Sequence, residues 1–424
     1  MKLQKIIERL QKLHPKKIDL NLDRIQKLCK KLGSPQKNLN CISIIGTNGK
    51  YSTIQAIKAI LNEAKINCNI YTSPHVQKIN ERFIYNNKEI EDDNLANLLT
   101  EVEEINNNEQ ITFFEILTAA FFYGAKKYSN NINLIETGLF HRFDATNILK
   151  KNLASVITTI GLDHLDWLPE NEQTVDKIIF EKTSSLLKSN IIISKQTSKD
   201  ILDKVKSSIK ENKSKKIIFN DHYNYYTNEN NFFDYKDEFG NLKLPLPNLN
   251  GQFQLINISA AIATVRSLKN LNITDEQIKK GITKIKSIAR LQEIKNGKLK
   301  NLIKNNKLFV DGSHNPLGAK VLAEYLNTLS CKKHMILGMM LNKDHNQYLS
   351  YFKDKINSLT TIDIPNQENA IERNKLKNKL KLEGLEINSK PSIREAISSI
   401  PLKDNDIILI TGSLYLAGEV LNLN

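Results

Sequence analysis

The stretch NCISIIGTNGKYST, residues 40–53, decides the fold of this chain. Its apolar run at residues 41–45 predicts a buried strand, and the segment from Thr53 to Ala64 predicts a helix. The loop between them, residues 46–52, reads G-x-x-G-K-x-S, a shortened variant of the phosphate-binding pattern G-x-x-x-x-G-K-[ST]. Strand, glycine loop, lysine, hydroxyl and helix together predict a phosphate cradle.

A loop of this kind binds an anion because its backbone N–H groups and the N-terminus of the following helix face the ligand. Lys50 can reach the terminal phosphates of a nucleotide, and the Ser52 hydroxyl can bind the magnesium ion of that nucleotide. The other candidate nucleotide contacts in the loop are Gly46, Thr47, Asn48, Gly49 and Tyr51. The alternative is an ordinary strand–turn–helix with a chance pair of glycines, and the lysine and hydroxyl favour phosphate binding over it.

Length and composition predict a folded protein of two domains rather than a nucleic-acid-binding protein. A chain of 424 residues is too long for one core, and its 40% hydrophobic content argues against global disorder. The net charge of +15 favours anionic partners. However, the basic residues are scattered, mostly lysine, and mixed with asparagine and isoleucine, so we expect small polyanionic substrates and no nucleic acid.

The cysteines and the apolar segments predict a cytoplasmic protein that does not bind membranes. No pair of cysteines has the spacing of a metal site or a disulfide framework; they are Cys29, Cys41, Cys68 and Cys331. The first helix, expected at residues 3–13, mixes charged and apolar residues, unlike a signal peptide. The apolar run at residues 407–423 is broken by two glycines and a glutamate, which argues against a membrane span.

Polar side chains follow three predicted strands of the first domain. Ser73, Glu136 and His164 each stand at or just beyond the carboxyl end of an apolar run. Ligands of open parallel sheets bind at this edge, and a carboxylate there is a suitable magnesium ligand. In isolation, a Ser-Pro turn or a histidine after a strand is usually structural. Three such groups at one sheet edge favour a ligand site.

The motifs of the chain resemble those of the folylpolyglutamate synthase/dihydrofolate synthase family within the Mur ligase superfamily. The most specific are T-S-P-H at residues 72–75, G-L-D-H-L-D-W-L at 161–168 and D-G-S-H-N-P at 311–316. About ten motifs follow the family order along the whole chain. Tyr51 stands where the family usually has glycine, and Phe140-His141 stand where it has two glycines.

The resemblance implies an α/β fold with two domains joined by a hinge near Lys286. Residues 1–286 would be a P-loop, parallel-sheet ATPase domain that also holds the pterin site. Residues 287–424 would be a smaller Rossmann-like α/β domain. Activity would need closure of the two domains over one nucleotide.

The resemblance also implies roles for individual residues. Magnesium would be held by Ser52, Ser73, Glu136, His164 and a carbamylated Lys182, of which His164 and Lys182 join Lys50 as catalytic residues. The nucleotide would further contact Asn257, Arg290 and Asp311. The substrate would contact Asp19, Leu20, Asn21, Leu22, Phe113, Phe114, Glu115, Phe143, Asp144, Ala145 and His314.

Four of these residues also have a structural interpretation. From sequence alone, Glu181-Lys182 is typical of a surface charge pair, and Asn257 of a helix cap. Aromatic residues at a helix start, such as Phe113-Phe114, more often belong to a core than to a ligand site. The resemblance favours the functional interpretation at each position.

The implied reaction is ATP-driven amide formation. The γ-phosphate passes to a substrate carboxylate, and the amine of L-glutamate then attacks the acyl phosphate, so catalysis consists of positioning and charge neutralisation. The implied ligands are ATP, Mg²⁺, L-glutamate and dihydropteroate or a reduced folate, bound by a monomer. The alternatives are a Mur-type amino-acid ligase acting on cell-wall precursors and a P-loop nucleotide switch.

Overall fold

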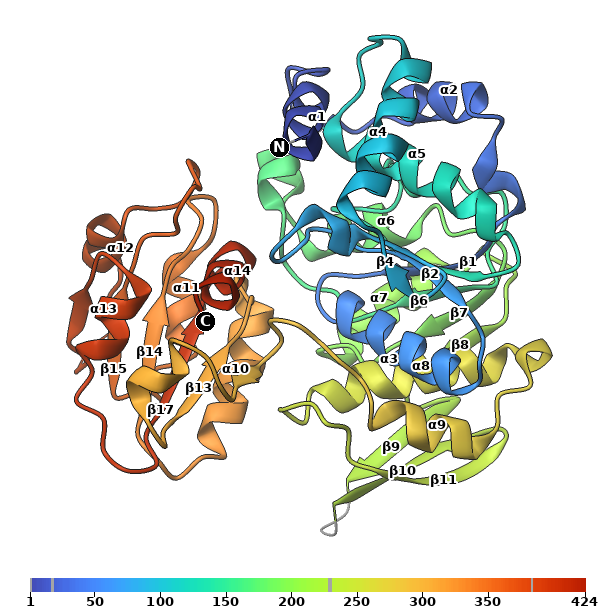
Figure 1. Ribbon diagram of the computed structural model, residues 1–424. Helices are drawn as coiled ribbons and strands as arrows, with labels where there is room; N and C mark the ends of the chain where they lie inside the picture. Colours follow the sequence, from blue (N-terminus) through green and yellow to red (C-terminus); the bar gives the residue numbers. More distant parts are fainter. Residues whose placement is uncertain (1, 17–18, 228–230, 383) are drawn as a thin grey trace. The chain divides into compact units, whose positions relative to one another are not determined.

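The computed structural model describes residues 2–16, 19–227, 231–382 and 384–424. Within these residues the chain forms two compact units. Unit 1 comprises Met1–His164, Leu168–Asn248 and Leu255–Ile285. Unit 2 comprises Leu165–Trp167, Leu249–Gln254 and Lys286–Asn424. Both units are α/β with a mainly parallel sheet, which confirms the predicted fold class (Figure 1).

The main sheet of unit 1 has the strand order β4-β3-β2-β5-β1-β6-β7-β8. Its parallel strands are β1 (Asn40–Ile45), β2 (Cys68–Tyr71), β5 (Ile132–Glu136), β6 (Ala154–Ile157), β7 (Asn190–Ile193) and β8 (Lys216–Ile218). The short strands β3 (Phe83–Tyr85) and β4 (Lys88–Glu89) extend one edge in antiparallel pairing. Central strands of this kind are almost wholly apolar because helices cover both faces of the sheet.

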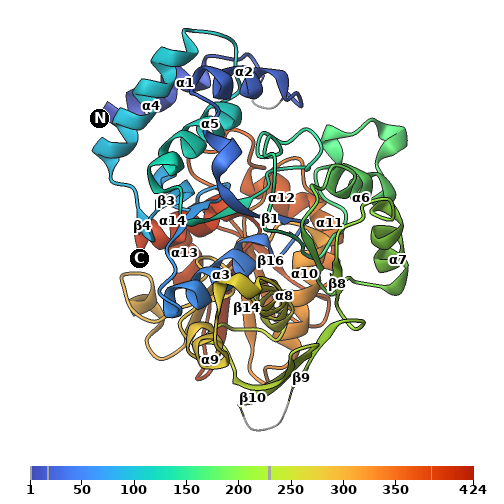
Figure 2. The ribbon, with the colours of Figure 1, turned by 90° about the vertical axis from the view of Figure 1, so that its right-hand side faces the viewer.

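The phosphate-binding loop directly follows the central strand β1. Ile42, Ile44 and Ile45 are fully buried in it. Helix α3 (Lys50–Glu63) and helix α8 (Gln254–Ser267) lie on one face, and helix α5 (Phe113–Ala125) lies on the other (Figures 1 and 2). The remaining helices of unit 1 are α1 (Lys2–Gln11), α2 (Asp23–Lys31), α4 (Asp92–Asn106), α6 (Val175–Thr183), α7 (Lys199–Ser208) and α9 (Asp275–Ile282).

Two helices begin earlier than the sequence pattern predicts. The helix after the phosphate loop begins at Lys50 instead of Thr53, because Gly49 takes a left-handed conformation (φ +90°) and ends the loop there. Helix α8 begins at Gln254, so Asn257 lies inside its first turn. The helix-cap interpretation of Asn257 is therefore wrong.

Unit 1 also contains a small antiparallel sheet. It has the order β11-β10-β9, formed by β9 (Tyr223–Thr227), β10 (Phe232–Asp237) and β11 (Gly240–Pro245). Arg266 of α8 ties this sheet to the helices, because its Nε lies 2.9 Å from Asp237 Oδ2 and its NH1 lies 2.5 Å from Asp275 Oδ1.

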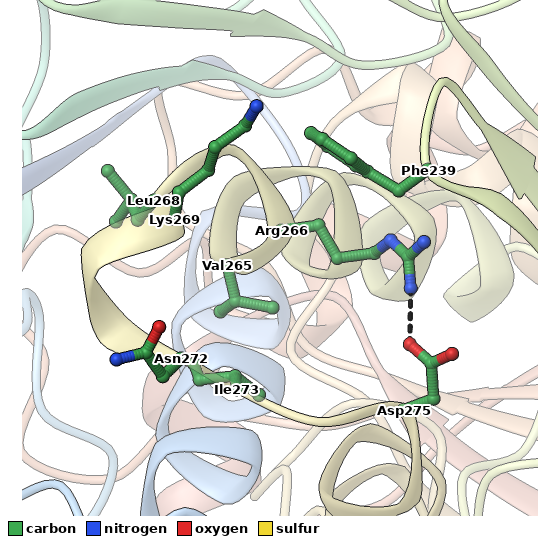
Figure 3. A pocket seen from close by; sticks show the side chains of 8 residues that line it. All are labelled: Phe239, Val265, Arg266, Leu268, Lys269, Asn272, Ile273 and Asp275. Carbon is green, nitrogen blue, oxygen red and sulfur yellow. Dashed lines mark hydrogen bonds and ion pairs between the residues drawn. The ribbon is translucent and has the colours of Figure 1, made fainter.

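A hollow of about 440 Å³ opens beside this junction (Figure 3). The ring of Phe239 faces the Arg266 guanidinium there, 5.5 Å from ring centroid to guanidinium carbon. Because two carboxylates already neutralise Arg266, we interpret the hollow as a structural junction between the small sheet and the helices.

The sheet of unit 2 has the order β12-β13-β17-β14-β15-β16. Its parallel strands are β13 (Lys307–Val310), β14 (Lys333–Leu337), β15 (Ser358–Thr361), β16 (Ile387–Ser389) and β17 (Ile407–Thr411), with β12 (Gln292–Ile294) antiparallel at one edge. The helices are α10 (Pro316–Asn327), α11 (His345–Ser350), α12 (Arg373–Lys379), α13 (Ile393–Ser398) and α14 (Leu414–Leu423). None of the helices in the described part of the chain has both the length and the hydrophobicity to cross a bilayer.

Gly281 lets α9 approach the phosphate-loop helix α3 closely. A Cβ at this position would lie 2.7 Å from the Cα of Ile60 and 3.1 Å from the carbonyl oxygen of Ala59. We predict that Gly281→Ala lowers the free energy of unfolding by about 1–2 kcal/mol, because overpacking against a rigid backbone outweighs the helix propensity of alanine. Urea denaturation measures the change.

The matched control is Lys280→Ala at the exposed neighbouring position, which should change stability by less than about 0.5 kcal/mol. A Gly281→Ala protein as stable as wild type would show that α3 and α9 can move apart without loss.

Candidate active site

The phosphate loop needs glycine at both ends because its neighbours leave no room for a side chain. Gly46 has φ +148° and Gly49 has φ +90°. A Cβ on Gly46 would lie 2.0 Å from Thr158 Oγ1, and one on Gly49 would lie 2.2 Å from Asn257 Oδ1. The predicted nucleotide contact Asn257 therefore lies directly against the loop.

The segment that follows β6 holds the loop in place. The backbone N–H groups of Thr47 and Asn48 both donate to the carbonyl oxygen of Thr159, at 3.0 and 3.1 Å. Thr47 Oγ1 donates to the carbonyl oxygen of Gly161 and accepts from the Gly161 N–H. The phosphate loop and the G-L-D-H motif are thus one hydrogen-bonded assembly.

The side chain of Lys50 folds back over the phosphate loop. Its Nζ donates to the carbonyl oxygens of Gly46 and Thr47, each at 3.2 Å. Tyr51 and Ser52 follow in the first turn of α3, where Ser52 is buried and Tyr51 half-buried. The helix N-terminus adds partial positive charge, so the loop is suited to an anion.

Three of the five predicted metal ligands lie at one edge of the sheet. Strands β2, β5, β1 and β6 are parallel neighbours, so Ser73, Glu136, the phosphate loop and His164 all follow carboxyl ends at that edge. The backbone N–H of Ser73 donates to Glu136 Oε2 at 3.2 Å. The Nε2 of His164 lies 3.8 Å from Asp163 Oδ2. The structure thus brings Ser73 and Glu136 into contact and places His164 after a nearby strand.

Lys182 is buried, so its interpretation as part of a surface charge pair is wrong. Its side chain in α6 is only 2% exposed, and its Nζ donates to the carbonyl oxygen of Leu139 at 2.6 Å. Burial and the positive charge of Lys50 lower the pKa of Lys182 to about 7, although Asp163 and Asp144 oppose the shift. Lys182, Lys50 and Asp144 therefore act on one another within one site.

An Arg–Glu clamp holds the segment that contacts Lys182. Arg142 donates to Glu181 through Nε at 2.9 Å and NH2 at 2.6 Å. The backbone N–H groups of His141 and Arg142 donate to the carbonyl oxygen of Glu181. These bonds fix the segment on α6 and place the Leu139 carbonyl at the Lys182 amine.

Phe140 and His141, which replace the family's glycines, are packed in the interior. They are 1% and 2% exposed. The ring centroid of Phe140 lies 5.6 Å from Lys182 Nζ, and His141 Nδ1 lies 2.9 Å from Ser185 Oγ. Burial and the charge of Lys182 lower the pKa of His141 to about 3, so this imidazole is neutral. The two side chains form part of the wall around Lys182.

Two of the predicted substrate segments meet at Gly138. The Asp144 Oδ2 accepts the Gly138 N–H at 2.9 Å. A Cβ on Gly138 would lie 2.6 Å from Asp144 Oδ2 and 3.2 Å from the Phe114 ring. Burial raises the pKa of Asp144 to about 6, although hydrogen bonds from Thr146 and Gly138 and the charge of Lys182 lower it. The residues around Phe114 and Asp144 are thus neighbours, and Asp144 reaches the Lys182 site.

Arg24 links a third predicted substrate segment, the loop before α2, to the start of α5. This arginine is not among the residues predicted to form the site. Arg24 Nε donates to Glu115 Oε2 at 3.0 Å, and NH1 donates to Asp19 Oδ2 at 2.8 Å. The predicted contacts Leu20, Asn21 and Leu22 are half-buried in the loop before α2. Nothing in the sequence pattern shows that this arginine turns toward a helix start more than ninety residues away.

Three further predicted residues, Arg290, Asp311 and His314, belong to unit 2, whereas Phe113, Phe143 and Ala145 belong to unit 1. Asp311 is buried, and its carboxylate accepts the N–H of Leu291 at 2.6 Å and that of Ser313 at 2.7 Å. Burial raises the pKa of Asp311, and the charge of Arg290 opposes this. His314 Nδ1 lies 3.0 Å from the carbonyl oxygen of Gly312. Arg290, Asp311 and His314 therefore gather around the end of β13.

The donor set suits magnesium better than a transition metal. In the residues that the structure describes, no group of three or more His, Cys, Asp or Glu side chains is placed to hold a metal. The predicted ligands Ser52, Ser73 and Glu136 instead offer oxygen atoms, which Mg²⁺ prefers. An unmodified Lys182 ammonium cannot bind a cation, so it fits only after conversion to a carbamate.

We predict that Arg142→Gln lowers the free energy of unfolding by about 1–3 kcal/mol, because it leaves the Glu181 carboxylate, which is 5% exposed, without its bidentate partner. The control is Lys177→Gln, whose Nζ lies 3.5 Å from the same carboxylate and which should cost less than about 1 kcal/mol. Urea denaturation compares the two. Equal, small losses would show that the clamp does not hold the loop.

The chain is similar to known proteins along nearly its whole length. Residues 297–414 match the family model described as Mur ligase, glutamate ligase domain. The chain is 28% identical over 435 residues to the dihydrofolate synthase/folylpolyglutamate synthase of Haemophilus influenzae, covering 97% of this chain and 94% of the relative. It is 27% identical over 422 residues to the protein of the same name in Bacillus subtilis, covering 94% of both.

Solved structures confirm the fold. The structure of E. coli FolC in complex with DHPP and ADP has a TM-score of 0.85 at 24% identity and covers 99% of this chain and 97% of its own. The bifunctional folylpolyglutamate synthase/dihydrofolate synthase of Yersinia pestis, complexed with AMPPNP and an Mn ion, has a TM-score of 0.86 at 22% identity with the same coverage. These matches confirm the predicted resemblance of this chain to the folylpolyglutamate synthase/dihydrofolate synthase family of Mur ligases.

Proposed function

We propose that this protein is an ATP-dependent ligase that adds L-glutamate to dihydropteroate, to the glutamate tail of reduced folates, or to both. The observation that carries the proposal is the continuity of the site in unit 1. The charges of Lys50 and Asp144 both act on the buried Lys182, Lys182 donates to the carbonyl oxygen of Leu139, and Asp144 accepts the neighbouring Gly138 N–H beside the Phe114 ring. A triphosphate and a second substrate can therefore be bound next to each other, and the similar proteins carry this activity in their names.

The reaction would proceed in two displacements without a protein nucleophile. An oxygen of the substrate carboxylate attacks the γ-phosphorus of ATP, and ADP leaves. The amine of L-glutamate attacks the carbonyl carbon of the acyl phosphate, the C–O bond breaks, phosphate leaves and the nitrogen loses a proton. Lys50 and the loop N–H groups hold the phosphates and stabilise the transferring phosphoryl group.

We assign the magnesium site to the edge formed by β2, β5, β1 and β6. Its ligands would be Ser52, Ser73, Glu136, His164 and the carbamate of Lys182. Bound there, the ion would neutralise charge on the phosphates during transfer. The contact between the Ser73 N–H and Glu136 holds two of these residues together before any ion binds.

We assign residues 1–286 to the ATP-binding domain with the pterin site and residues 287–424 to the ligase domain. The match of residues 297–414 to a glutamate ligase model supports the second assignment. Within unit 1 Asn257 would contact the nucleotide; Arg290 and Asp311 are proposed as nucleotide contacts and His314 as a substrate contact. We further infer a monomer. The free thiols of Cys29, Cys41, Cys68 and Cys331 favour the reducing cytoplasm as its compartment.

The two alternatives predict different ligands. A ligase for cell-wall precursors would bind UDP-sugar peptides, and a nucleotide switch would hydrolyse ATP without glutamate or pterin. The folate ligase is favoured over both because the similar proteins, which match nearly the whole chain, are folate ligases.

We predict that purified protein releases ADP only when ATP, L-glutamate and dihydropteroate or tetrahydrofolate are all present. Lys50→Ala should reduce this rate at least about a hundredfold, because it removes a charged donor from the transferring phosphoryl group. The exposed Lys37→Ala is the control and should leave the rate unchanged. Release of ADP that needs a UDP-sugar peptide, or that needs neither glutamate nor pterin, would contradict the proposal.

Lys182 should carry a carbamate. It is buried beside the cationic Lys50, and this environment favours the uncharged amine, whose nitrogen can form a bond to the carbon of CO₂ with loss of a proton. Wild-type protein in ¹³C-labelled bicarbonate should show a carbamate carbon signal by NMR, and Lys182→Met should lose that signal. An unchanged signal in the variant, or none in wild type, would contradict the assignment.

A further inference from the structure

We propose that Arg24 is a positioning residue that assembles the pterin end of the substrate site. The inference rests on the proposed function, which places a pterin site in residues 1–286, and on the family resemblance, which assigns Asp19 and Glu115 to the substrate. Arg24 touches neither the phosphate loop nor the segment that anchors it in the described residues; its bonds reach the loop before α2 and the start of α5. Its effect should therefore be confined to one substrate.

Arg24 uses each nitrogen of its guanidinium group to bind these two segments. Nε donates to Glu115 Oε2 at 3.0 Å, NH1 to Asp19 Oδ2 at 2.8 Å, and NH2 to the carbonyl oxygen of Asp19 at 2.8 Å. The side chain is 20% exposed, so these charge-assisted bonds are partly shielded from water. The planar geometry of arginine suits such a three-way contact, and lysine could make only part of it.

One carboxylate oxygen of Glu115 is hydrogen-bonded within the protein, and the other has no hydrogen-bond partner among the described residues. Its Oε2 accepts from Arg24 and from the backbone N–H of Thr112 at 2.8 Å. Its Oε1 is buried and has no hydrogen-bond partner among the described residues. Because the carboxylate is only 3% exposed, an unsatisfied oxygen is costly unless a ligand supplies a donor. A ring with N–H groups would supply one.

The neighbouring ring shows where such a ligand would lie. Phe114 precedes Glu115, and its ring stacks on Tyr71 with centroids 6.1 Å apart and borders Gly138. An aromatic ring and a carboxylate acceptor thus both come from the first turn of α5. Arg24 fixes the carboxylate of this pair relative to the Asp19 loop.

The experiment compares steady-state kinetics of wild type, Arg24→Gln, Arg24→Lys and Arg9→Gln, each with ATP, L-glutamate and dihydropteroate varied in turn. Arg9 is the matched control, because it makes a bidentate pair with Glu103 in the same N-terminal region, at 3.0 and 2.6 Å. Arg24→Gln should raise the KM for dihydropteroate about ten- to a hundredfold, the loss expected for a charged hydrogen bond. Its KM for ATP should change less than about twofold, Arg24→Lys should be intermediate, and Arg9→Gln should match wild type.

The outcomes separate the inference from the proposed function. If wild type does not use dihydropteroate or a reduced folate, the proposed function fails and the inference fails with it. If wild type uses the substrate but both Arg24 variants keep its KM, the inference alone is overturned. If the KM values for ATP and dihydropteroate rise together, or if Arg9→Gln has the same effect, Arg24 is only structural. Should Arg24→Gln fail to fold, the KM values of Arg24→Lys decide by the same criteria.

Discussion

The candidate site depends on the parallel pairing of β1 with β5 on one side and with β6 on the other. Register places Ile44 beside Glu136 and Ile45 beside Ile157. The chain that leaves β1 as the phosphate loop therefore lies between a carboxylate and the segment that leads to His164. Any slip in this register would separate Glu136 from the loop, Thr158 from Gly46, and the Thr159 carbonyl oxygen from the N–H groups of Thr47 and Asn48.

This constraint explains why the fold was predictable from the sequence. Short apolar runs separated by helical segments predict a parallel sheet, and a glycine loop after one run identifies the strand that carries the ligand. The start of α3 was less predictable, because the conformation of Gly49 sets it and the apolar pattern does not. The close contact of Gly46 with Thr158 involves distant parts of the chain and leaves no local signal.

The surroundings of Lys182 show what sequence reasoning cannot supply. A Glu-Lys pair on a helix is usually exposed, and the pattern of α6 alone cannot show that a loop covers it. The loop does so because Glu181 binds Arg142, 39 residues earlier, and because Phe140 and His141 pack inward. Burial of this kind is a property of tertiary packing, so the resemblance predicted a role for Lys182 while the residues themselves favoured a surface pair.

The same packing places two lysines so that a bound anion would lower their electrostatic repulsion. Lys50 and Lys182 interact repulsively, and burial adds to the cost of the Lys182 charge. Asp144 and Asp163 offset part of that cost, but Asp144 is itself buried and its pKa is raised. A polyanion at the phosphate loop would stabilise both ammonium groups, and a carbamate would turn one of them into an anion that attracts a cation. The protein thus places two mutually repelling lysines where the negative charge of a nucleotide would relieve their repulsion.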